Sequence, residues 1–349
     1  MVEKKYVKNY YQGIYLTETI LGNPNGDFND NAPRNFDGRV FTTDKCIKYN
    51  VRKYMQNTIE DLNKKENIIF AFPRLCENSS DEDNKFKTRD DVFDFLLNDI
   101  DEIDGLENSE KYEKQFEFLK QNSPDVRMFG GTFSFQSDNK STKQIYGPIQ
   151  LTYGIDINDA EFTRLQIGAP FSTTSGKQKT NGSEYVVDDA IISYDITVNP
   201  NNHPNLLLES DLGLFMKSLW YGTNLRKSTS KRTDSKLLIF IKFKKCEDNT
   251  IINIGELKEL VSVYNIKEHK LGNEKIILNV SKLIKKLIDY WKYIDLVDFY
   301  YDDEDIQLKI IIDDFEEDIK NFKKWKNILA EDKELVNKFK FYNPSVLLE

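Results

Sequence analysis

The order of strand-like and helix-like segments constrains the fold of this 349-residue chain more than any other feature. Residues 10–20 alternate in polarity and predict a strand with one buried face, and Thr43-Asp44 supplies a helix N-cap before apolar residues at helical spacing. Further segments follow in this order: β-rich 125–135 and 147–155 as a hairpin pair, strand 184–198, the helix that Glu209 and Asp211 open, and strand 237–243. This β-α-β-β-α-β succession predicts an α+β fold with a ferredoxin-like or RRM-type sheet, whose open face commonly binds single-stranded RNA.

Three segments interrupt or extend this succession. Residues 60–125 mix acidic runs with the helical fragments VFDFLLNDI and KYEKQFEFLK, and we interpret them as an inserted subdomain. Residues 159–184 have too few apolar residues to fold alone and predict a projecting hairpin or flexible arm. Residues 246–349 form a C-terminal elaboration, with helix-type segments at 255–264 and 281–294 and a strand at 306–312.

The net charge of −9 is unevenly distributed along the chain. Segments 60–125 and 295–318 each carry a charge of −10, so the remaining 259 residues carry +11. Because ordinary salt screens charges beyond about 10 Å, a basic groove can bind nucleic acid on an acidic protein. The alternative is that the two acidic segments are simply solvated surfaces.

Composition favours a protein of the reducing cytoplasm. The N-terminus has no apolar signal region and no apolar run reaches eighteen residues, which argues for a soluble, unexported chain. Cys46, Cys76 and Cys246 have no CxxC spacing, and His203 and His269 lie 66 positions apart, so neither a disulfide framework nor a zinc site is expected. No nucleotide-binding or hydrolase motif is present, and we predict no cofactor, no metal and no membrane partner.

The first candidate site is the loop 22–39 with the basic helix that follows. The Gly- and Asn-rich loop exposes backbone N–H groups, which together with neighbouring positive charges can cradle phosphate. Those charges come from Arg34, Arg39, Lys45, Lys48 and Arg52. The alternative is an N-terminal helix with an ordinary solvated face.

Two further basic segments are candidates. Arg226, Lys227, Lys231 and Arg232 lie in a Ser/Thr-rich loop near aromatic residues, a combination that can hold a backbone and stack a base. The arm carries Arg164, Lys177 and Lys179. A mobile loop and a disordered surface hairpin are the alternatives for these two segments.

The first loop also contains Asp27, Asp30 and Asp37, which could hold a divalent metal for RNA cleavage. Its sequence DFNDN lacks the mid-loop Gly and terminal Glu of an EF-hand. Asp and Asn in such loops more often cap turns. We therefore expect a structural role for Asp27.

Loop and helix together, GNPNGDFNDNAPRNFDGRVFTTDKCIKYNVRKY (22–54), resemble the opening signature of the CRISPR-associated Cas-seven family (RAMP superfamily), the backbone subunits of type I Cascade complexes, and most nearly its type I-B branch. The stretches DVRMFGG (125–131) and GPIQLTYG (147–154) resemble the family's paired central motif, and residues 175–200 resemble its next block. The likeness covers most of residues 10–245.

This resemblance implies a hand-shaped, RNA-binding protein. The palm would be residues 1–59 and 126–245, the inserted fingers 60–125, and the thumb hairpin 159–184. The matched motifs add Asn23, Asn25, Arg127, Phe129 and Gly130 to the predicted RNA-binding residues.

The leading hypothesis is therefore a non-catalytic cytoplasmic subunit that oligomerises along CRISPR RNA. It would present the guide for pairing with target DNA, beside the guide 5′-end-binding and large subunits. One alternative is a metal-dependent endoribonuclease of the type III kind, which cuts target RNA with a loop aspartate. Another is an assembly component that binds only proteins.

Overall fold

The computed structural model describes residues 4–72, 108–134, 142–168, 181–246, 250–321 and 337–349. The chain divides into two compact units, each described by itself. The sheet unit consists of residues 9–47, 151–197 and 223–349, and the helix-rich unit of residues 1–8, 48–150 and 198–222. Among the described helices none is long and apolar enough to span a membrane.

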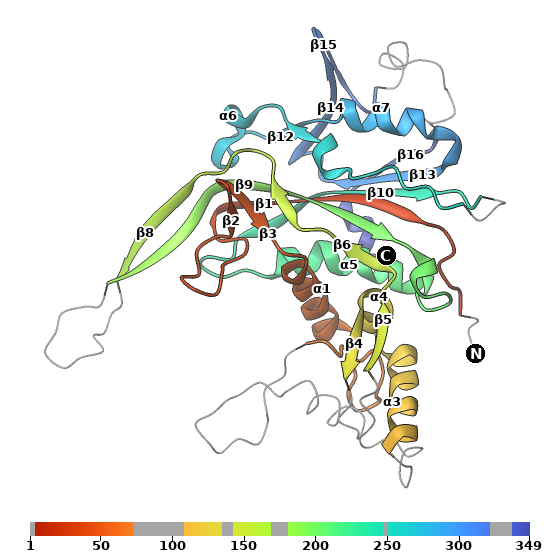
Figure 1. Cartoon of the computed structure of the whole chain (residues 1–349). Coiled ribbons are helices and arrows are strands. Elements are labelled where there is room, and N and C mark those ends of the chain that lie inside the picture. The colour runs from red at the N-terminus through yellow and green to blue at the C-terminus, as the bar shows by residue number, and fades with distance from the viewer. Residues whose placement is uncertain (1–3, 73–107, 135–141, 169–180, 247–249, 322–336) are drawn as a thin grey trace, which may run out of the picture. The chain divides into compact units, whose positions relative to one another are not determined.

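The main sheet runs in the order β16-β13-β10-β1-β9-β7-β3-β2, with β6 and β8 pairing with β9 outside this path (Figure 1). Its strands are β1 (Tyr11–Gly22), β2 (Asn35–Phe36), β3 (Arg39–Thr42), β6 (Ile149–Leu151), β7 (Gly154–Asp156), β8 (Phe162–Gly168), β9 (Asn181–Val198), β10 (Thr233–Phe243), β13 (Ile294–Tyr301) and β16 (Phe339–Tyr342). Strands β10, β1, β9 and β7 are the fourth, first, third and second strands of the predicted succession and lie side by side in that order. This arrangement is ferredoxin-like and confirms the predicted α+β class.

Strand β1 is buried on both faces, which corrects the expectation of one buried face. Ile14 and Leu16 lie in the main hydrophobic core. On the other face, the hydroxyl groups of Tyr15 and Thr19 form hydrogen bonds with the hydroxyl groups of Ser235 and Thr233 on β10. The antiparallel partner β10 matches β1 in register, with Ile14 opposite Ile239. Hydrogen bonds across the strands satisfy the polar side chains, so a central strand can carry them.

The C-terminal residues cover the apolar face of this sheet. They form η2 (Lys258–Leu260), β11 (Ser262–Val263), α6 (Ile266–His269), η3 (Lys270–Gly272), β12 (Ile276–Asn279), α7 (Ser281–Asp289), η4 (Trp291–Tyr293), β14 (Ile306–Ile312), β15 (Phe315–Asp318) and η5 (Pro344–Leu348). Leu283 and Leu287 of α7 share one core with Ile14 of β1 and Ile239 of β10. The expectation of an open RRM-type face is therefore wrong for this side of the sheet, because burying these side chains is more favourable than exposing them to water.

Two C-terminal predictions need correction. Residues 255–264 contain only the short helix η2 and strand β11, and the helix expected over 281–294 ends at Asp289. The chain then enters β13, which pairs antiparallel with β10, and β14 confirms the strand expected at 306–312. The apolar run Ile294–Tyr301 reads as either helix or strand locally, and its distant partner decides the outcome.

The helix-rich unit contains most of α1 (Asp44–Thr58) and α5 (Glu209–Leu225), together with α3 (Asn108–Asn122), α4 (Pro124–Phe129), β4 (Gly130–Ser134), β5 (Thr142–Tyr146) and η1 (Pro200–Asn202). Its core joins Ile68 and Phe70 to Leu119 of α3 and Val126 of α4. Helix α3 confirms the helical fragment KYEKQFEFLK, whereas VFDFLLNDI lies outside the described residues. The fingers assignment for 60–125 stays a prediction.

The hairpin expected between 125–135 and 147–155 is wrong. Residues Pro124–Phe129 form helix α4, and the hairpin pairs β4 with β5 instead. Proline is favoured in the first helical turn, where its missing N–H has no partner to lose, and Asp125 suits the positive end of the helix dipole. This start signal outweighs the β-rich composition that follows it.

Candidate nucleic-acid interface

The loop between β1 and α1 is shaped by its own asparagines. The Asn25 side-chain oxygen accepts hydrogen bonds from the backbone N–H and hydroxyl of Thr43 at 3.0 and 3.1 Å. The Asn25 carbonyl accepts another from the Arg34 N–H at 3.0 Å. Asn23 is buried and donates through Nδ2 to the Asn31 carbonyl. The two predicted RNA-binding asparagines therefore fix the path of the loop at the N-terminus of α1.

The loop carboxylates of Asp27 and Asp30 cap turns. Asp27 accepts hydrogen bonds from the N–H groups of Asn29 and Asp30 at 2.9 and 3.1 Å, and Asp30 accepts one from Ala32 at 2.9 Å. The hydrogen bond from the Asp30 N–H is the main reason why the pKa of Asp27 is lowered. Asp37 lies further along, with a φ of 50°. The bonds of Asp27 and Asp30 are those of a structural loop.

The structure brings the first two candidate segments together within the sheet unit. The Asn23 N–H donates to the Ser230 carbonyl at 2.7 Å, and Lys231 Nζ donates to the Asn23 carbonyl at 3.0 Å. Arg226 Nη1 lies 3.3 Å from the sulfur of Cys46 in the first turn of α1. Loop 22–39 and loop 226–232 thus meet at the start of α1, and we call these two loops the cationic loop pair.

Positive charges are crowded in the cationic loop pair. Burial lowers the pKa of Lys231, and the nearby positive charge of Arg226 lowers it further. Arg232 and Lys45 are exposed, whereas Lys227 bonds to Asp234 in an exposed ion pair. Crowded cations repel one another, and an anion bound beside them would relieve that repulsion.

Two exposed aromatic side chains of the loop were missed by the sequence reasoning. Phe28 is 98% exposed and Phe36 is 78% exposed. The Arg34 guanidinium lies 5.3 Å from the centre of the Phe28 ring, and Arg39 on β3 is exposed. A phenylalanine surrounded in sequence by Gly, Asn and Asp has no apolar neighbours to bury it. This context could have predicted from the sequence that both rings are exposed. Such rings can stack on unpaired bases.

The arm contains a described two-stranded part. Strand β8 pairs antiparallel with the start of β9, from Phe162 opposite Val187 to Gly168 opposite Asn181, and Figure 1 shows this pair as a long hairpin. Exposed Arg164 donates to the Ser183 hydroxyl at 2.7 and 3.0 Å and lies over the Tyr185 ring. Lys177 and Lys179 lie outside the described residues.

Within the helix-rich unit, two predicted basic residues of α1 lie over one aromatic ring. Lys48 Nζ is 5.4 Å and Arg52 Cζ is 5.1 Å from the centre of the Phe129 ring. Arg52 Nε also donates to Asp125 at 2.9 Å. The buried Asp125 carboxylate further accepts the N–H groups of Phe70 and Ala71, both at 3.0 Å. Asp125 therefore positions the Arg52 guanidinium.

Arg127 and Gly130 have structural environments. Arg127 is buried and donates Nε and Nη2 to the two Asp211 oxygens at 2.7 and 2.8 Å, while Nη1 donates to the Gln121 carbonyl at 2.7 Å. Gly130 has a φ of 66°, and a Cβ there would lie 2.1 Å from the Ile145 carbonyl oxygen. The Arg127 side chain is thus held by Asp211 and Gln121, and the backbone at Gly130 leaves no room for a larger residue; a contact of either residue with RNA stays a prediction.

Apart from Arg164 on the arm, the predicted residues that the structure describes therefore form two groups, one in each unit. The cationic loop pair and its neighbours bring together Asn23, Asn25, Arg34, Arg39, Lys45, Arg226, Lys227, Lys231 and Arg232. The helix-rich unit holds Lys48, Arg52, Arg127, Phe129 and Gly130.

Comparison with known proteins defines the class of this chain. The family model for CRISPR-associated protein Cas7 matches residues 9–281, so the chain belongs to this family, the Cas-seven family of the resemblance above. No curated protein matches the chain. Two similar solved structures are described as "CRISPR RNA-guided surveillance complex, pre-nicking" and "CRISPR RNA-guided surveillance complex". Both are 9% identical over 97% of this chain, covering 98% and 96% of theirs, with TM-scores of 0.46 and 0.45.

Proposed function

We propose that this chain is a non-catalytic backbone subunit of a type I, I-B-like, CRISPR surveillance complex. It binds the phosphate backbone of CRISPR RNA, adds further copies of itself along the guide, and leaves the bases to pair with target DNA. The guide 5′-end-binding and large subunits join this assembly, which operates in the cytoplasm. Membership of the Cas7 family supports this proposal.

The cationic loop pair is the observation that carries the proposal. Lys231 and Arg226 belong to one loop, and Lys231 bonds to the backbone of the other at 3.0 Å. Exposed Lys45 and Arg232 add positive charge from the helix start and the second loop. Two segments far apart in sequence thus contribute cations to one place, as a site for a polyanion requires.

The salt dependence of RNA binding tests the role of these charges. We expect affinity for a guide-length RNA to fall steeply with salt and to vary little with sequence. Each lost phosphate contact on single-stranded RNA reduces the slope of log affinity against log salt by about 0.7. The double variant Lys45→Glu/Arg232→Glu should therefore reduce that slope by about 1.4 and weaken binding to all sequences alike.

A matched control makes the same change of charge elsewhere in the sheet unit. Lys282→Glu/Lys285→Glu reverses two basic side chains that lie one helical turn apart on α7. Neither residue is among the predicted RNA contacts. We expect this variant to keep the wild-type slope. Equal slopes for both double variants, or wild-type binding that barely changes with salt, would contradict the proposal.

The non-catalytic part of the proposal has a separate test. Complementary RNA incubated with the protein and Mg²⁺ should remain intact. Periodic, metal-dependent cuts that disappear in Asp27→Ala would instead establish the endoribonuclease alternative. Particles purified from cells should contain several copies of the chain with a guide RNA, and particles without RNA would support a protein-only assembly role.

A further inference from the structure

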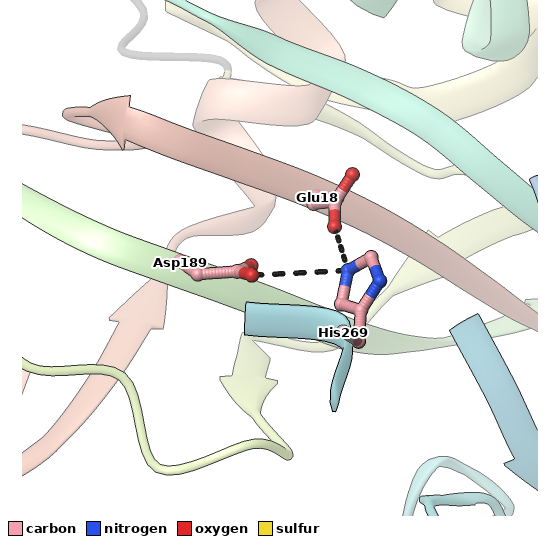
Figure 2. A group of neighbouring side chains, drawn as sticks. All are labelled: Glu18, Asp189 and His269. Carbon is pink, nitrogen blue, oxygen red and sulfur yellow. Dashed lines mark hydrogen bonds and ion pairs between the residues drawn. The ribbon is translucent and has the colours of Figure 1, made fainter. Parts of the chain in front are cut away.

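Three buried, ionisable side chains converge in the sheet unit. Glu18 lies on β1, Asp189 on β9 and His269 at the end of α6, and all three are buried. Figure 2 shows the Glu18 and Asp189 carboxylates pointing toward the same ring nitrogen of His269. One ligand atom from each residue lies within 4.8 Å of the others. Three segments distant in sequence thus supply the donor atoms of one small centre.

A backbone contact fixes the orientation of the histidine ring. His269 Nδ1 contacts the Glu274 carbonyl oxygen, which can only accept, so the proton must lie on Nδ1. The other nitrogen, Nε2, is in hydrogen-bond contact with Glu18 Oε1, which also can only accept, and lies 3.7 Å from Asp189 Oδ2. Nε2 therefore carries a proton in this arrangement, and a bound metal ion would replace that proton. A ring held through one nitrogen by a backbone carbonyl, with the other nitrogen aimed at carboxylates, is the usual arrangement of a metal-binding histidine.

The negative charge of this centre is only partly balanced by its protein neighbours. Lys236 Nζ lies 3.3 Å from Glu18 Oε2 but also 3.0 Å from Asp305. Asp189 Oδ2 accepts the Leu271 N–H at 2.9 Å, while its Oδ1 is buried without a hydrogen-bond partner among the described residues. An unpaired buried carboxylate oxygen is costly, and a cation is the partner that suits it.

We propose that Glu18, Asp189 and His269 form a structural site for one divalent transition-metal ion, best matched by Zn²⁺. One imidazole nitrogen with two carboxylate oxygens suits zinc, whereas Mg²⁺ and Ca²⁺ prefer oxygen ligands alone. Tetrahedral ligands about 2.0–2.2 Å from zinc lie about 3.4 Å apart, close to the separation of Nε2 and Asp189 Oδ2. The ion would enter between Nε2 and Glu18, and a water would supply a fourth ligand.

A metal here would tie the C-terminal segment to the main sheet. His269 and Leu271 belong to α6 and η3, whereas Glu18 and Asp189 belong to neighbouring strands of the sheet. Glu18 lies four residues before the end of β1, and loop 22–39 begins where this strand ends. The bound ion would therefore hold the strand end from which the cationic loop pair begins, whatever the function of that loop.

Metal titration of the full chain tests this site. After chelator treatment, the wild-type protein should bind one Zn²⁺ per chain by calorimetry, with a higher melting temperature, and should not respond to Mg²⁺. His269→Asn and Asp189→Asn should weaken Zn²⁺ binding by more than about 100-fold, because loss of an outer partner alone costs 10–100-fold. His203→Asn, which changes the other histidine of the chain, should bind zinc as the wild type does.

Three results would overturn the site. They are wild-type protein that binds no zinc, His269→Asn that binds it unchanged, and a Co²⁺ spectrum with the charge-transfer band of a thiolate, which would place the ion on a cysteine. Asp189→Asn preserves side-chain shape and carries the test if His269→Asn fails to fold. If His269→Asn and Asp189→Asn were destabilised but the wild type bound no zinc, the three side chains would be held together by a shared proton and not by a metal ion.

Discussion

The Arg127–Asp211 pair allows a sharp test of whether a basic residue of the helix-rich unit serves the fold or a ligand. Both side chains are buried, and two hydrogen bonds of 2.7 and 2.8 Å join them. Asp211 also accepts the Leu208 N–H at 3.0 Å, near the start of α5. In Arg127→Met, the Leu208 N–H would be the one partner left to the Asp211 carboxylate among the residues that the structure describes.

The expected cost follows from that isolation. Removing one partner of a buried ion pair destabilises a protein by about 3–5 kcal/mol, because the remaining charge loses its counter-ion without regaining water. Asp211→Asn should cost a similar amount, since the buried Arg127 guanidinium would lose its counter-charge and one of its two acceptors there. The double variant removes both charges, so it should cost less than the sum of the singles by about 2–3 kcal/mol.

Urea unfolding of the four proteins, followed by circular dichroism and by tryptophan fluorescence, measures this coupling. Arg164→Met changes an exposed arginine and should alter stability by less than about 0.5 kcal/mol. Single variants that each lose under about 1 kcal/mol, or losses that simply add, would refute the reasoning. Arg127 would instead be a phosphate ligand if Arg127→Met unfolded at the wild-type urea concentration and its slope of log RNA affinity against log salt fell by about 0.7.

Two further predictions concern backbone strain and a buried acid. Gly130→Ala should destabilise the protein by more than about 2 kcal/mol in thermal melts, because its positive φ and the Ile145 carbonyl leave no room for a Cβ. Gly213 is an exposed position of α5 with open space around it, so Gly213→Ala should stabilise the protein by up to about 1 kcal/mol. Burial raises the pKa of Asp298 to about 6, although Lys242 and Lys340 oppose this, so the folded state loses stability as pH rises from about 4 to 6. Asp298→Asn should then be more stable than the wild type by about 1–3 kcal/mol at pH 7.5 and indistinguishable at pH 4, and equal stabilities at pH 7.5 would contradict this.

The succession of elements could be predicted from local sequence. Periodicity and capping located β1, α1, α5 and β10, and their order specified the ferredoxin-like sheet. Local pattern failed at α4, where apolar and aromatic residues suggested a strand but Pro124 began a helix. It also failed at β13, because its partner β10 lies some fifty residues earlier and no short window contains both.

The site could be predicted only in parts. Each basic loop is visible in the sequence, but the contact between Lys231 and Asn23 spans 208 positions and depends on the completed sheet. Burial was equally hidden, since an arginine that bonds Asp211 inside the protein looks in sequence like one that binds phosphate. The covered sheet face was missed because the patterns of the helix expected at 281–294 and the strand expected at 306–312 do not show which surface these elements pack against.

Ultraviolet crosslinking of the purified chain to a guide-length RNA, with the crosslinked peptides identified by mass spectrometry, tests the central claim most directly. We expect crosslinks to concentrate in loops 22–39 and 226–232, with Phe28 and Phe36 among the modified residues because both rings are exposed. Crosslinks confined to the C-terminal elements on the covered side of the sheet, or absent while RNA is bound, would contradict an RNA-binding role for the cationic loop pair.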